Sequence, residues 1–283
     1  MRDQKTESAK EFYERTAEDY DKEYEEPYWK LYDEITWENI KQFLPKRKKV
    51  LILDAGGGTG HWAIRLAKNG YRVVLTDISE NMLKVAKEKI KKEKLQDKVE
   101  TKNVDIRDMS CFPSDSFDMA IAEGDPVSYC LNAERATREL ARVVKQNAHV
   151  VVSVDNKYTV IHRVLIPQLI QENFSKQASN KLSRFLRTGV LRRDFEFQAF
   201  TPEELKALFE TCGLKVIRII GKPILAQLIP REKRDKTIKN HFASMLKLEL
   251  KFCDTPSLIG IGGHLEMVGI KRAYGVSLNL SRG

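Results

Sequence analysis

The sequence predicts a doubly wound α/β fold, in which a central sheet is covered by helices on both faces. From position 50 onward, short apolar runs alternate with helix-like patterns, which is the arrangement of βαβ units around a parallel sheet. A glycine-rich turn, DAGGGTG at positions 54–60, follows the first apolar run. In doubly wound sheets the ligand lies beyond the carboxyl ends of the strands where the strand order switches, so this turn predicts a ligand site.

Seven apolar runs are expected to form the strands of the sheet. The first, Val50 to Asp54, is short, unbroken and bounded by turn residues, as expected for a strand that is buried on both faces. The predicted strands are 50–54, 71–76, 99–104, 117–123, 149–155, 214–220 and 264–272.

Helix signals fall between these runs. Ser79 has the features of an N-cap, with Ile78 and Leu83 spaced as a hydrophobic staple, and Thr201 precedes a proline and two glutamates in the order typical of a helix start. Helices are therefore expected over 60–69, 79–92, 133–145 and 201–213. We divide the chain into an N-terminal helical cover (1–45), a ligand-binding core (46–155), a helical insertion (156–194), a continuation of the core (195–222), a second helical insertion (223–258) and the last core strand with a tail (259–283).

Length and composition indicate a globular protein. With 283 residues, of which 42% are hydrophobic, the chain can bury the core of one large domain with insertions. No stretch has the roughly 18 apolar residues that a membrane span needs, and the first residues lack the apolar segment of a signal peptide, so we expect a cytoplasmic protein without a membrane partner. The four cysteines form no C-x-x-C pair and lie near no histidine at metal-ligand spacing, so we expect buried thiols and no metal site.

The glycine turn does not match the dinucleotide fingerprint G-x-G-x-x-G, because His61 stands where the third glycine is required. The pattern present is D-x-G-x-G-x-G, formed by Asp54, Gly56, Gly58 and Gly60. Glycines let the backbone approach a ligand closely, and an acid at the strand end suits a cationic or hydroxyl-rich ligand better than a pyrophosphate.

Taken with TDIS at 76–79 and VDIRD at 104–108, this turn resembles the class I S-adenosylmethionine-dependent methyltransferases, over roughly residues 10–155 and 195–272. The resemblance implies a Rossmann-like seven-stranded sheet, mostly parallel with an antiparallel last strand, whose helical insertions form a lid. It also implies S-adenosyl-L-methionine as the cofactor and methyl transfer by in-line displacement.

The resemblance assigns roles to individual residues. The glycine turn would wrap the methionine part of the cofactor, Asp77 would bind the ribose hydroxyls, and Asp105 would accept the adenine amine. The cofactor-binding residues implied are Tyr13, Tyr20, Asp54, Gly56, Gly58, Gly60, Asp77, Ile78, Met82, Asp105, Ile106 and Glu123. Taken singly, each acid also has a structural explanation, as a turn cap, a neighbour of an N-cap or a solvated loop residue.

The N-terminal segment is aromatic and acidic. Ser8 and Glu11 form a capping box, and the helix that they open is expected to end at Pro27. Residues 12–37 hold eight of the 24 aromatic residues, and residues 11–38 carry 11 acids against 3 bases. Such a segment suits a cationic sulfonium. In the resembled family a segment like FYERTAEDYD folds over the cofactor; the alternative is an amphipathic helix packed on the sheet edge.

In-line displacement needs positioning rather than a covalent intermediate or a metal. A proton acceptor is required if the acceptor atom bears a proton, and the candidates are Glu123, Asp125, Tyr129 and His162. The insertions are expected to wall the acceptor pocket, with Tyr158, His162, Phe174, Phe185, Leu186 and Phe242 as lining residues. The segment EGDPVSY at 123–129 departs at Val127 and Ser128 from the D-P-P-Y element of nucleic-acid amino methyltransferases, which disfavours that chemistry.

The excess of positive charge in the chain falls mainly in the two insertions. Residues 156–194 contain 8 bases and 2 acids, and residues 223–258 contain 7 and 4. The first insertion could contact RNA, but its arginines (Arg184, Arg187, Arg192 and Arg193) could instead pair with the acidic N-terminal segment, which is the alternative that we favour here. The leading hypothesis is therefore a methyltransferase for an O, N or S atom of a small molecule; the alternatives are an RNA or protein acceptor and a non-catalytic cofactor-binding regulator.

Overall fold

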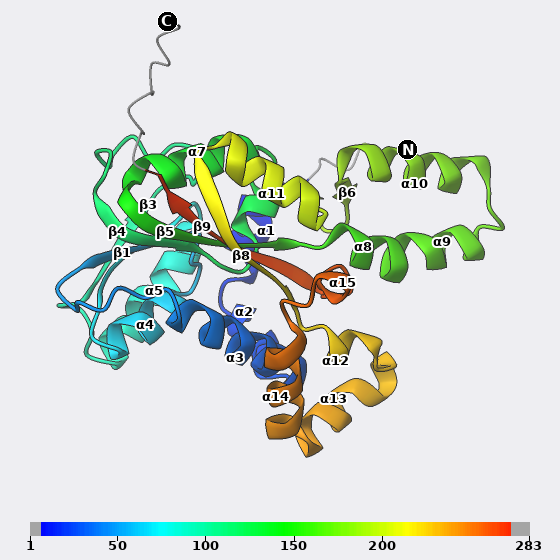
Figure 1. Ribbon diagram of the computed structural model, residues 1–283, viewed down its shortest axis with the longest axis horizontal. Coiled ribbons are helices and arrows are strands. Elements are labelled where there is room, and N and C mark those ends of the chain that lie inside the picture. The colour runs from blue at the N-terminus through cyan, green and yellow to red at the C-terminus, as the bar shows by residue number, and fades with distance from the viewer. Residues whose placement is uncertain (1–6, 273–283) are drawn as a thin grey trace, which may run out of the picture.

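The computed structural model describes residues 7–272, which are arranged around one seven-stranded sheet (Figure 1). The strands follow the order β3 (Val99–Asn103), β2 (Arg72–Asp77), β1 (Leu51–Ala55), β4 (Phe117–Ala122), β5 (Val144–Asp155), β9 (His264–Lys271) and β8 (Leu214–Lys222). The strands from β3 to β5 pair in parallel, and β9 is antiparallel to both of its neighbours. The predicted sheet with an antiparallel last strand is confirmed.

The strand order switches between β1 and β4. From β1 the chain moves outward through β2 to β3, and β4 then returns to the other side of β1. A crevice at the carboxyl ends of β1 and β4 is therefore the expected ligand position in this fold.

Helices cover both faces of the sheet, because alternate strand residues point to opposite sides. Ile52 packs with α3 (Pro27–Lys41), α4 (His61–Lys68) and α5 (Glu80–Lys92), whereas its neighbour Leu53 packs with α7 (Ala133–Val143) and α11 (Pro202–Thr211). Figure 1 shows the two layers below and above the sheet.

The N-terminal segment differs from the prediction of one helix that ends at Pro27. The capping box of Ser8 and Glu11 is present and opens α1 (Ala9–Thr16), but a turn separates α1 from α2 (Tyr20–Glu23). Pro27 begins α3 rather than ending a helix. A proline at the first helical position loses no hydrogen bond, because that N–H has no intrahelical partner.

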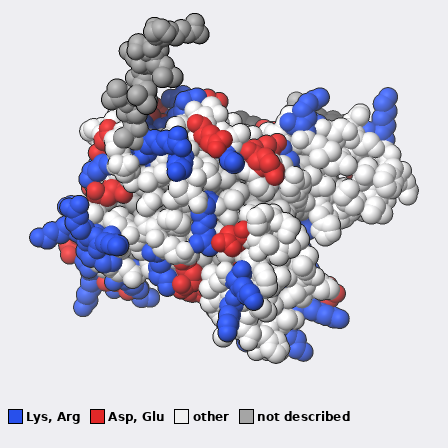
Figure 2. All heavy atoms as spheres, viewed as in Figure 1, with Lys and Arg blue, Asp and Glu red and all other residues white. Residues whose placement is uncertain are grey.

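The first insertion is an arm that extends from one end of the sheet (Figure 1). It contains α8 (Lys157–Val160), the π-helix η1 (Ile161–Leu165), α9 (Ile166–Gln171) and α10 (Lys176–Thr188). At its base the short strands β6 (Val190–Arg192) and β7 (Glu196–Gln198) form a hairpin, which the prediction of a purely helical insertion missed. Lys and Arg side chains stand on the upper edge of the arm in Figure 2.

The second insertion forms a helical lobe beside α3. It contains α12 (Leu225–Leu228), α13 (Arg231–Asn240), α14 (Phe242–Phe252) and α15 (Pro256–Ile259). Its apolar residues share a cluster with Leu31 and Ile35 of α3. No helix within residues 7–272 is long and apolar enough to cross a membrane.

The four cysteines are free thiols, as expected, but only Cys212 and Cys253 are buried. Cys111 is exposed and Cys130 is half-buried, so the prediction of buried thiols is wrong for these two. Both lie in segments that connect the longer core elements, where packing is less complete than beneath the helices.

Candidate active site

The glycine turn occupies the carboxyl end of β1. Gly56, Gly58 and Gly60 have φ angles of +70°, +53° and +80°, which side chains rarely permit. A Cβ atom on Gly57 would lie 2.5 Å from the carboxylate of Asp54 and from the side chain of Leu75, so the turn passes too close to β1 and β2 to carry one there.

Asp54 lies beneath this turn, fully buried. Burial raises the pKa of its carboxyl group to about 7. Its position under the backbone supports the turn. The role in cofactor binding that the sequence suggests for Asp54 stays a prediction.

Asp77, at the end of β2, is bonded to the same turn. Its Oδ2 accepts a hydrogen bond from the Gly58 N–H at 2.9 Å, and its Oδ1 accepts one from the Ser79 N–H at 2.8 Å. Ser79 in turn caps α5 by accepting from the Met82 N–H at 3.1 Å. Burial raises the pKa of Asp77. The carboxylate therefore lies at the carboxyl end of β2, where it fixes the geometry of the turn.

The space above Gly58 is bounded by residues that the sequence assigned to the cofactor. A Cβ atom built on Gly58 would meet Met82 Sδ and Tyr20 Cε1, each at 4.0 Å. The hydroxyls of Tyr20 and Tyr24 lie 3.0 Å apart and would both lie 3.8 Å from a Cβ on Gly124, at the end of β4. The aromatic N-terminal segment thus spans the ends of β1 and β4.

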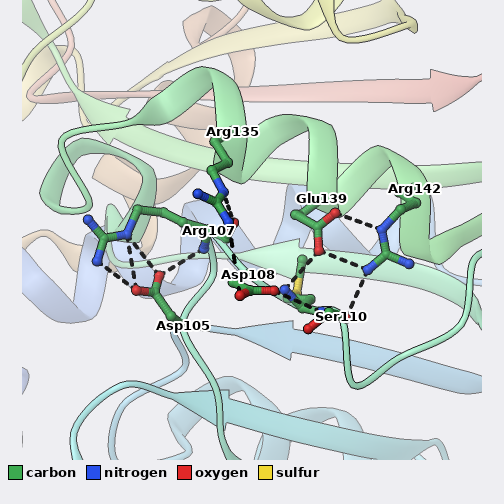
Figure 3. A network of polar contacts seen from close by, with 8 residues as sticks. Asp105, Arg107, Asp108, Ser110, Arg135, Glu139 and Arg142 are labelled. Atoms are coloured by element: carbon green, nitrogen blue, oxygen red, sulfur yellow. Dashed lines mark hydrogen bonds and ion pairs between the residues drawn. The ribbon is translucent and has the colours of Figure 1, made fainter.

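Asp105 is engaged by a neighbouring guanidinium (Figure 3). Arg107 Nη2 lies 2.6 Å from Asp105 Oδ2, and the Arg107 backbone N–H donates to Asp105 Oδ1 at 2.8 Å. Burial alone would raise the pKa of Asp105, but its hydrogen bonds from Arg107 outweigh this and lower it. An adenine contact, which stays a prediction, would have to add to this ion pair. Ile106 beside it is buried, whereas Ile78 is half-buried.

Glu123 belongs to a buried charge network that includes Lys222 of β8 and Glu266 of β9. Lys222 Nζ lies 2.7 Å from Glu123 Oε2, donates to Thr36 Oγ1 at 2.7 Å and also contacts Glu266. The side chains of Lys222, Glu123 and Glu266 are fully inaccessible. Burial, and then the charge of Glu266, raise the pKa of Glu123 well above its usual value. Glu123 is thereby fixed to the core rather than directed at an acceptor.

Asp125 contacts a histidine that the sequence analysis did not single out. Its backbone has a left-handed φ of 66°, and its Oδ2 lies 2.6 Å from Nδ1 of His264, the first residue of β9. The Ser153 hydroxyl accepts the backbone N–H groups of Gly124 and Asp125 at 3.0 and 3.1 Å. Burial would raise the pKa of Asp125, but His264 lowers it below its usual value. Burial would likewise lower the pKa of His264, but Asp125 raises it, so the two form an ion pair.

Asp155 completes this cluster, which we call the acid–base cluster (Asp125, Asp155 and His264). Asp155 ends β5 and is the register partner of His264 in the antiparallel ladder. Burial, and then the charge of Asp125, raise the pKa of Asp155 to about 7. No side-chain hydrogen bond involves its carboxylate among residues 7–272. The sequence did not mark Asp155 as a site residue, because an acid at a strand end has no distinctive pattern.

The acid–base cluster also has the spacing of metal ligands, since one donor atom from each residue lies within 4.8 Å of the others. The sequence contains no signal of this grouping, because the three residues are far apart in the chain. The Nδ1 of His264 is already in direct contact with Asp125, which is the geometry of an ion pair. We therefore interpret the cluster as proton-transfer groups.

Aromatic rings lie on both sides of the acid–base cluster and the glycine turn. Tyr13 lies 5.8 Å from Tyr20 and 5.9 Å from Tyr129, measured between ring centroids, and Tyr129 lies 5.2 Å from Phe195 of the hairpin loop. On the other side, Trp29 and Tyr32 of α3 lie 5.7 and 5.1 Å from the His264 ring. These rings supply π-faces to a cation and flat apolar walls to an acceptor.

Other predicted residues lie elsewhere. His162 is exposed on η1 and makes no contact with the acid–base cluster within the described residues. Phe174 and Leu186 are 66% and 50% exposed, so the prediction that they line a pocket is wrong. Phe185 is fully buried in the core of the arm, where the apolar packing of α10 requires it. Tyr158 is 46% exposed. Phe242 faces a cavity of about 570 Å³ beside Tyr24 and His61.

The sheet order, the glycine turn and the acid at the end of β2 define a nucleoside-binding protein of the doubly wound class. Residues 52–147 match the family model of a methyltransferase domain. Residues 52–147 thus form a methyltransferase domain, the protein is an S-adenosylmethionine-dependent methyltransferase, and S-adenosyl-L-methionine is its cofactor.

Its relatives differ in how much of the chain they cover. The tRNA 5-carboxymethoxyuridine methyltransferase of Escherichia coli (strain K12) is 21% identical over 84% of this chain and 87% of that protein. A demethylmenaquinone methyltransferase of Bacteroides fragilis is 30% identical, but over only 48% of this chain and 56% of that protein. The chain solved in complex with the Haloferax volcanii Trm112 methyltransferase activator has a similar fold, with a TM-score of 0.60 and 17% identity over 95% of this chain and all of that one.

Proposed function

We propose that this methyltransferase acts on an oxygen or nitrogen atom of a nucleoside in RNA, and that Asp155 accepts the proton that this atom loses. The bound cofactor supplies an electrophilic methyl group on a sulfonium. We propose that it is held by the residues that the resemblance implied, with Asp77 on the ribose and the rings of Tyr13 and Tyr20 over the cationic part.

The observation that carries the catalytic proposal is the state of Asp155. Its carboxylate lies beside the ion pair of Asp125 and His264, has no hydrogen-bond donor of its own among the described residues and has a pKa of about 7. A general base works best when its pKa is near the operating pH. When the acceptor atom is methylated, Asp155 would accept the proton that this atom loses.

The neighbours of Asp155 have supporting roles. The Asp125–His264 pair keeps a fixed negative charge and a fixed imidazolium next to the reacting atoms. Lys222, Glu123 and Ser153 hold the backbone after β4, from which Asp125 projects. Aromatic rings on both sides exclude water, which strengthens these interactions and aligns the acceptor.

The choice of acceptor class rests on how much of the chain each relative matches, because relatives with different acceptors share the methyltransferase core. The E. coli tRNA methyltransferase aligns over 84% of this chain and 87% of its own length, which extends well beyond the cofactor-binding core. The B. fragilis relative aligns over about half of the chain. We therefore base the acceptor proposal on the relative that matches most of the chain, whose printed substrate is a nucleoside of tRNA.

A small-molecule acceptor, methylated on O, N or S, is the second candidate. The observation that favours it is the enclosure of the acid–base cluster, in which Asp125 is 2% exposed. A protein acceptor and a non-catalytic, regulatory role are further alternatives that the same assay tests. A cytoplasmic location stays a prediction.

The test is methyl transfer from isotope-labelled S-adenosylmethionine to total tRNA, a metabolite panel and a protein extract, each assayed separately. Because a chain of similar fold was solved with a Trm112 activator, parallel reactions contain a Trm112-type protein. We expect label in tRNA, traced to one nucleoside after digestion, and retained in EDTA. Label only in metabolites would replace the acceptor proposal with the second candidate. Activity that requires an added metal would contradict the role of Asp155 as the proton acceptor.

A further inference from the structure

The arm, residues 156–194, carries cations that the rest of the protein does not neutralise. It has 8 bases and 2 acids. Five of the bases are exposed and take part in no ion pair or side-chain hydrogen bond within residues 7–272: Lys176, Arg184 and Arg187 of α10, with Arg192 and Arg193 at the tip of the β6–β7 hairpin. We call these five residues the arm cations.

The acidic N-terminal segment does not pair with them, contrary to the alternative favoured from the sequence. Several of its acids are engaged elsewhere: Glu14 accepts the backbone N–H groups of Glu80 and Asn81 at the start of α5, and Asp21 pairs with Lys89 at 2.6 Å. Glu7, just before the N-cap of α1, pairs with Arg15 of that helix. The arm cations therefore face solvent without an ion-pair partner among the described residues, and the charge of Arg193 also acts on Asp155, where it lowers the pKa of the carboxyl group against the larger rise caused by burial. Figure 2 shows Lys and Arg, and no gathering of Asp or Glu, on the arm.

Apolar side chains accompany these cations on the same arm. Phe174, in the loop between α9 and α10, is 66% exposed, Ile170 is 58% exposed and Leu186 is 50% exposed. Cations interspersed with exposed aromatic and apolar groups are typical of surfaces that bind the phosphates and bases of single-stranded or looped nucleic acid.

The arm cations continue directly into the wall of the crevice. Two residues after Arg193, Phe195 places its ring 5.6 Å from that of Tyr13 and 5.2 Å from that of Tyr129. Tyr129 belongs to α6 (Pro126–Tyr129), which begins immediately after Asp125. A polymer that lies along the arm is thus led to the acid–base cluster.

We propose that the arm cations bind the phosphate backbone of the RNA that presents the acceptor nucleoside, so that the arm holds the polymer while one nucleoside enters the crevice. This inference rests on the proposed function for its substrate class. It adds a second, distant contact surface, which a free nucleoside would not use.

The test compares two variants that lose the same charge. One carries Arg184→Gln, Arg187→Gln, Arg192→Gln and Arg193→Gln. The control carries Lys84→Gln, Lys87→Gln, Lys91→Gln and Lys92→Gln on α5, where all four lysines are exposed and unpaired among the described residues. Fluorescence anisotropy with labelled total tRNA measures affinity between about 50 and 250 mM KCl, a range over which phosphate binding is strongly salt-dependent. Calorimetry with S-adenosylmethionine reports on folding and the cofactor site.

We expect the arm variant to bind tRNA at least roughly tenfold more weakly at about 150 mM KCl, with the salt slope reduced by about 0.7–0.9 for each phosphate that it no longer neutralises. The control should stay within about twofold of the unaltered protein, and both variants should keep cofactor affinity. Equal tRNA affinity in the arm variant, or an equal reduction in both variants, would overturn the proposal. So would binding of the unaltered protein to phosphatidylserine vesicles but not to tRNA, since the arm would then be a membrane surface.

Failure of this inference differs from failure of the proposed function. If the arm variant methylates tRNA with unchanged KM and kcat, the nucleoside acceptor stands and the arm has no part in binding it. If tRNA binds through the arm cations but is never methylated while a metabolite is, the arm contact stands and the acceptor proposal is wrong.

Discussion

His264 Nδ1 lies 2.6 Å from Asp125 Oδ2, and this contact joins the first residue of β9 to the loop that follows β4. It exists because β9 runs antiparallel beside β5, so that His264 is paired in register with Asp155, at the carboxyl end of the parallel strands. The negative charge of Asp125 then contributes, after burial, to the raised pKa of Asp155. Sheet topology thus produces a titratable group near neutrality at the ligand edge.

Replacing Asp155 with asparagine should remove the general base. We expect kcat for tRNA to fall by about 10²-fold or more. In the unaltered protein the base must be ionised, so kcat should rise about tenfold per pH unit below a pKa of about 7 and level off above it. Single-turnover rates on both sides of this pKa measure this limb. If kcat of the variant still rose with pH in this range, another group would be the one that titrates. Cofactor affinity serves as the folding control.

Replacing Asp77 with alanine should weaken cofactor binding by roughly 1–3 kcal/mol, because two buried ribose hydrogen bonds would be lost. The carboxylate also accepts the N–H groups of Gly58 and Ser79, so Asp77→Asn is the matched variant that keeps part of this geometry. Calorimetry with S-adenosylmethionine gives the affinities and thermal unfolding confirms the fold. Unchanged affinity in folded Asp77→Ala would contradict the ribose role.

Replacing Lys222 with methionine should destabilise the protein by about 3–5 kcal/mol, because Glu123 and Glu266 would then share a dry site without a cation. Adding Glu123→Gln to this variant should recover part of the stability. Lys215, exposed on the same strand, supplies the control, since Lys215→Met should change stability by less than about 0.5 kcal/mol. Urea unfolding measures all three. Similar stability of Lys222→Met and the parent protein would mean that the network is not ionised.

Replacing Asp54 with asparagine should reduce the dependence of stability on pH. Its folded pKa of about 7 lies above the unfolded value of about 3.9, so the folded state binds the proton more tightly. The stabilisation of the folded state by protonation of Asp54 is complete below about pH 4. It is lost as the pH rises to about 7, at up to about 1.4 kcal/mol per pH unit. Urea unfolding at about pH 5 and about pH 8 should therefore show a smaller decrease for Asp54→Asn. Equal decreases would place the titration in other groups.

The strands and helices of the core were predictable because their signals are local. Apolar runs, N-caps such as Ser79 and the glycine turn each lie within a few consecutive residues, and the structure places β1, β2 and α5 within one or two residues of the predicted positions. Longer-range effects produced the differences. β5 begins at Val144 rather than near His149, because Val144 pairs with Phe117 while the exposed residues that follow it form no apolar run. The three-residue strands β6 and β7 are too short to show periodicity.

By itself the sequence determined the sheet, the glycine turn and the acids at the ends of β2 and β4, because each of these features depends on a few adjacent residues. Together they indicated the cofactor class. Only the tertiary structure decided which charged groups meet. Lys222 reaches Glu123 and Glu266, and His264 reaches Asp125 and Asp155, from distant parts of the chain. The reason is that β9 pairs with β5 and β8 pairs with β9. The end of β8 and the start of β9 therefore lie at the edge of the sheet where β4 and β5 end. No spacing along the chain predicts this pairing.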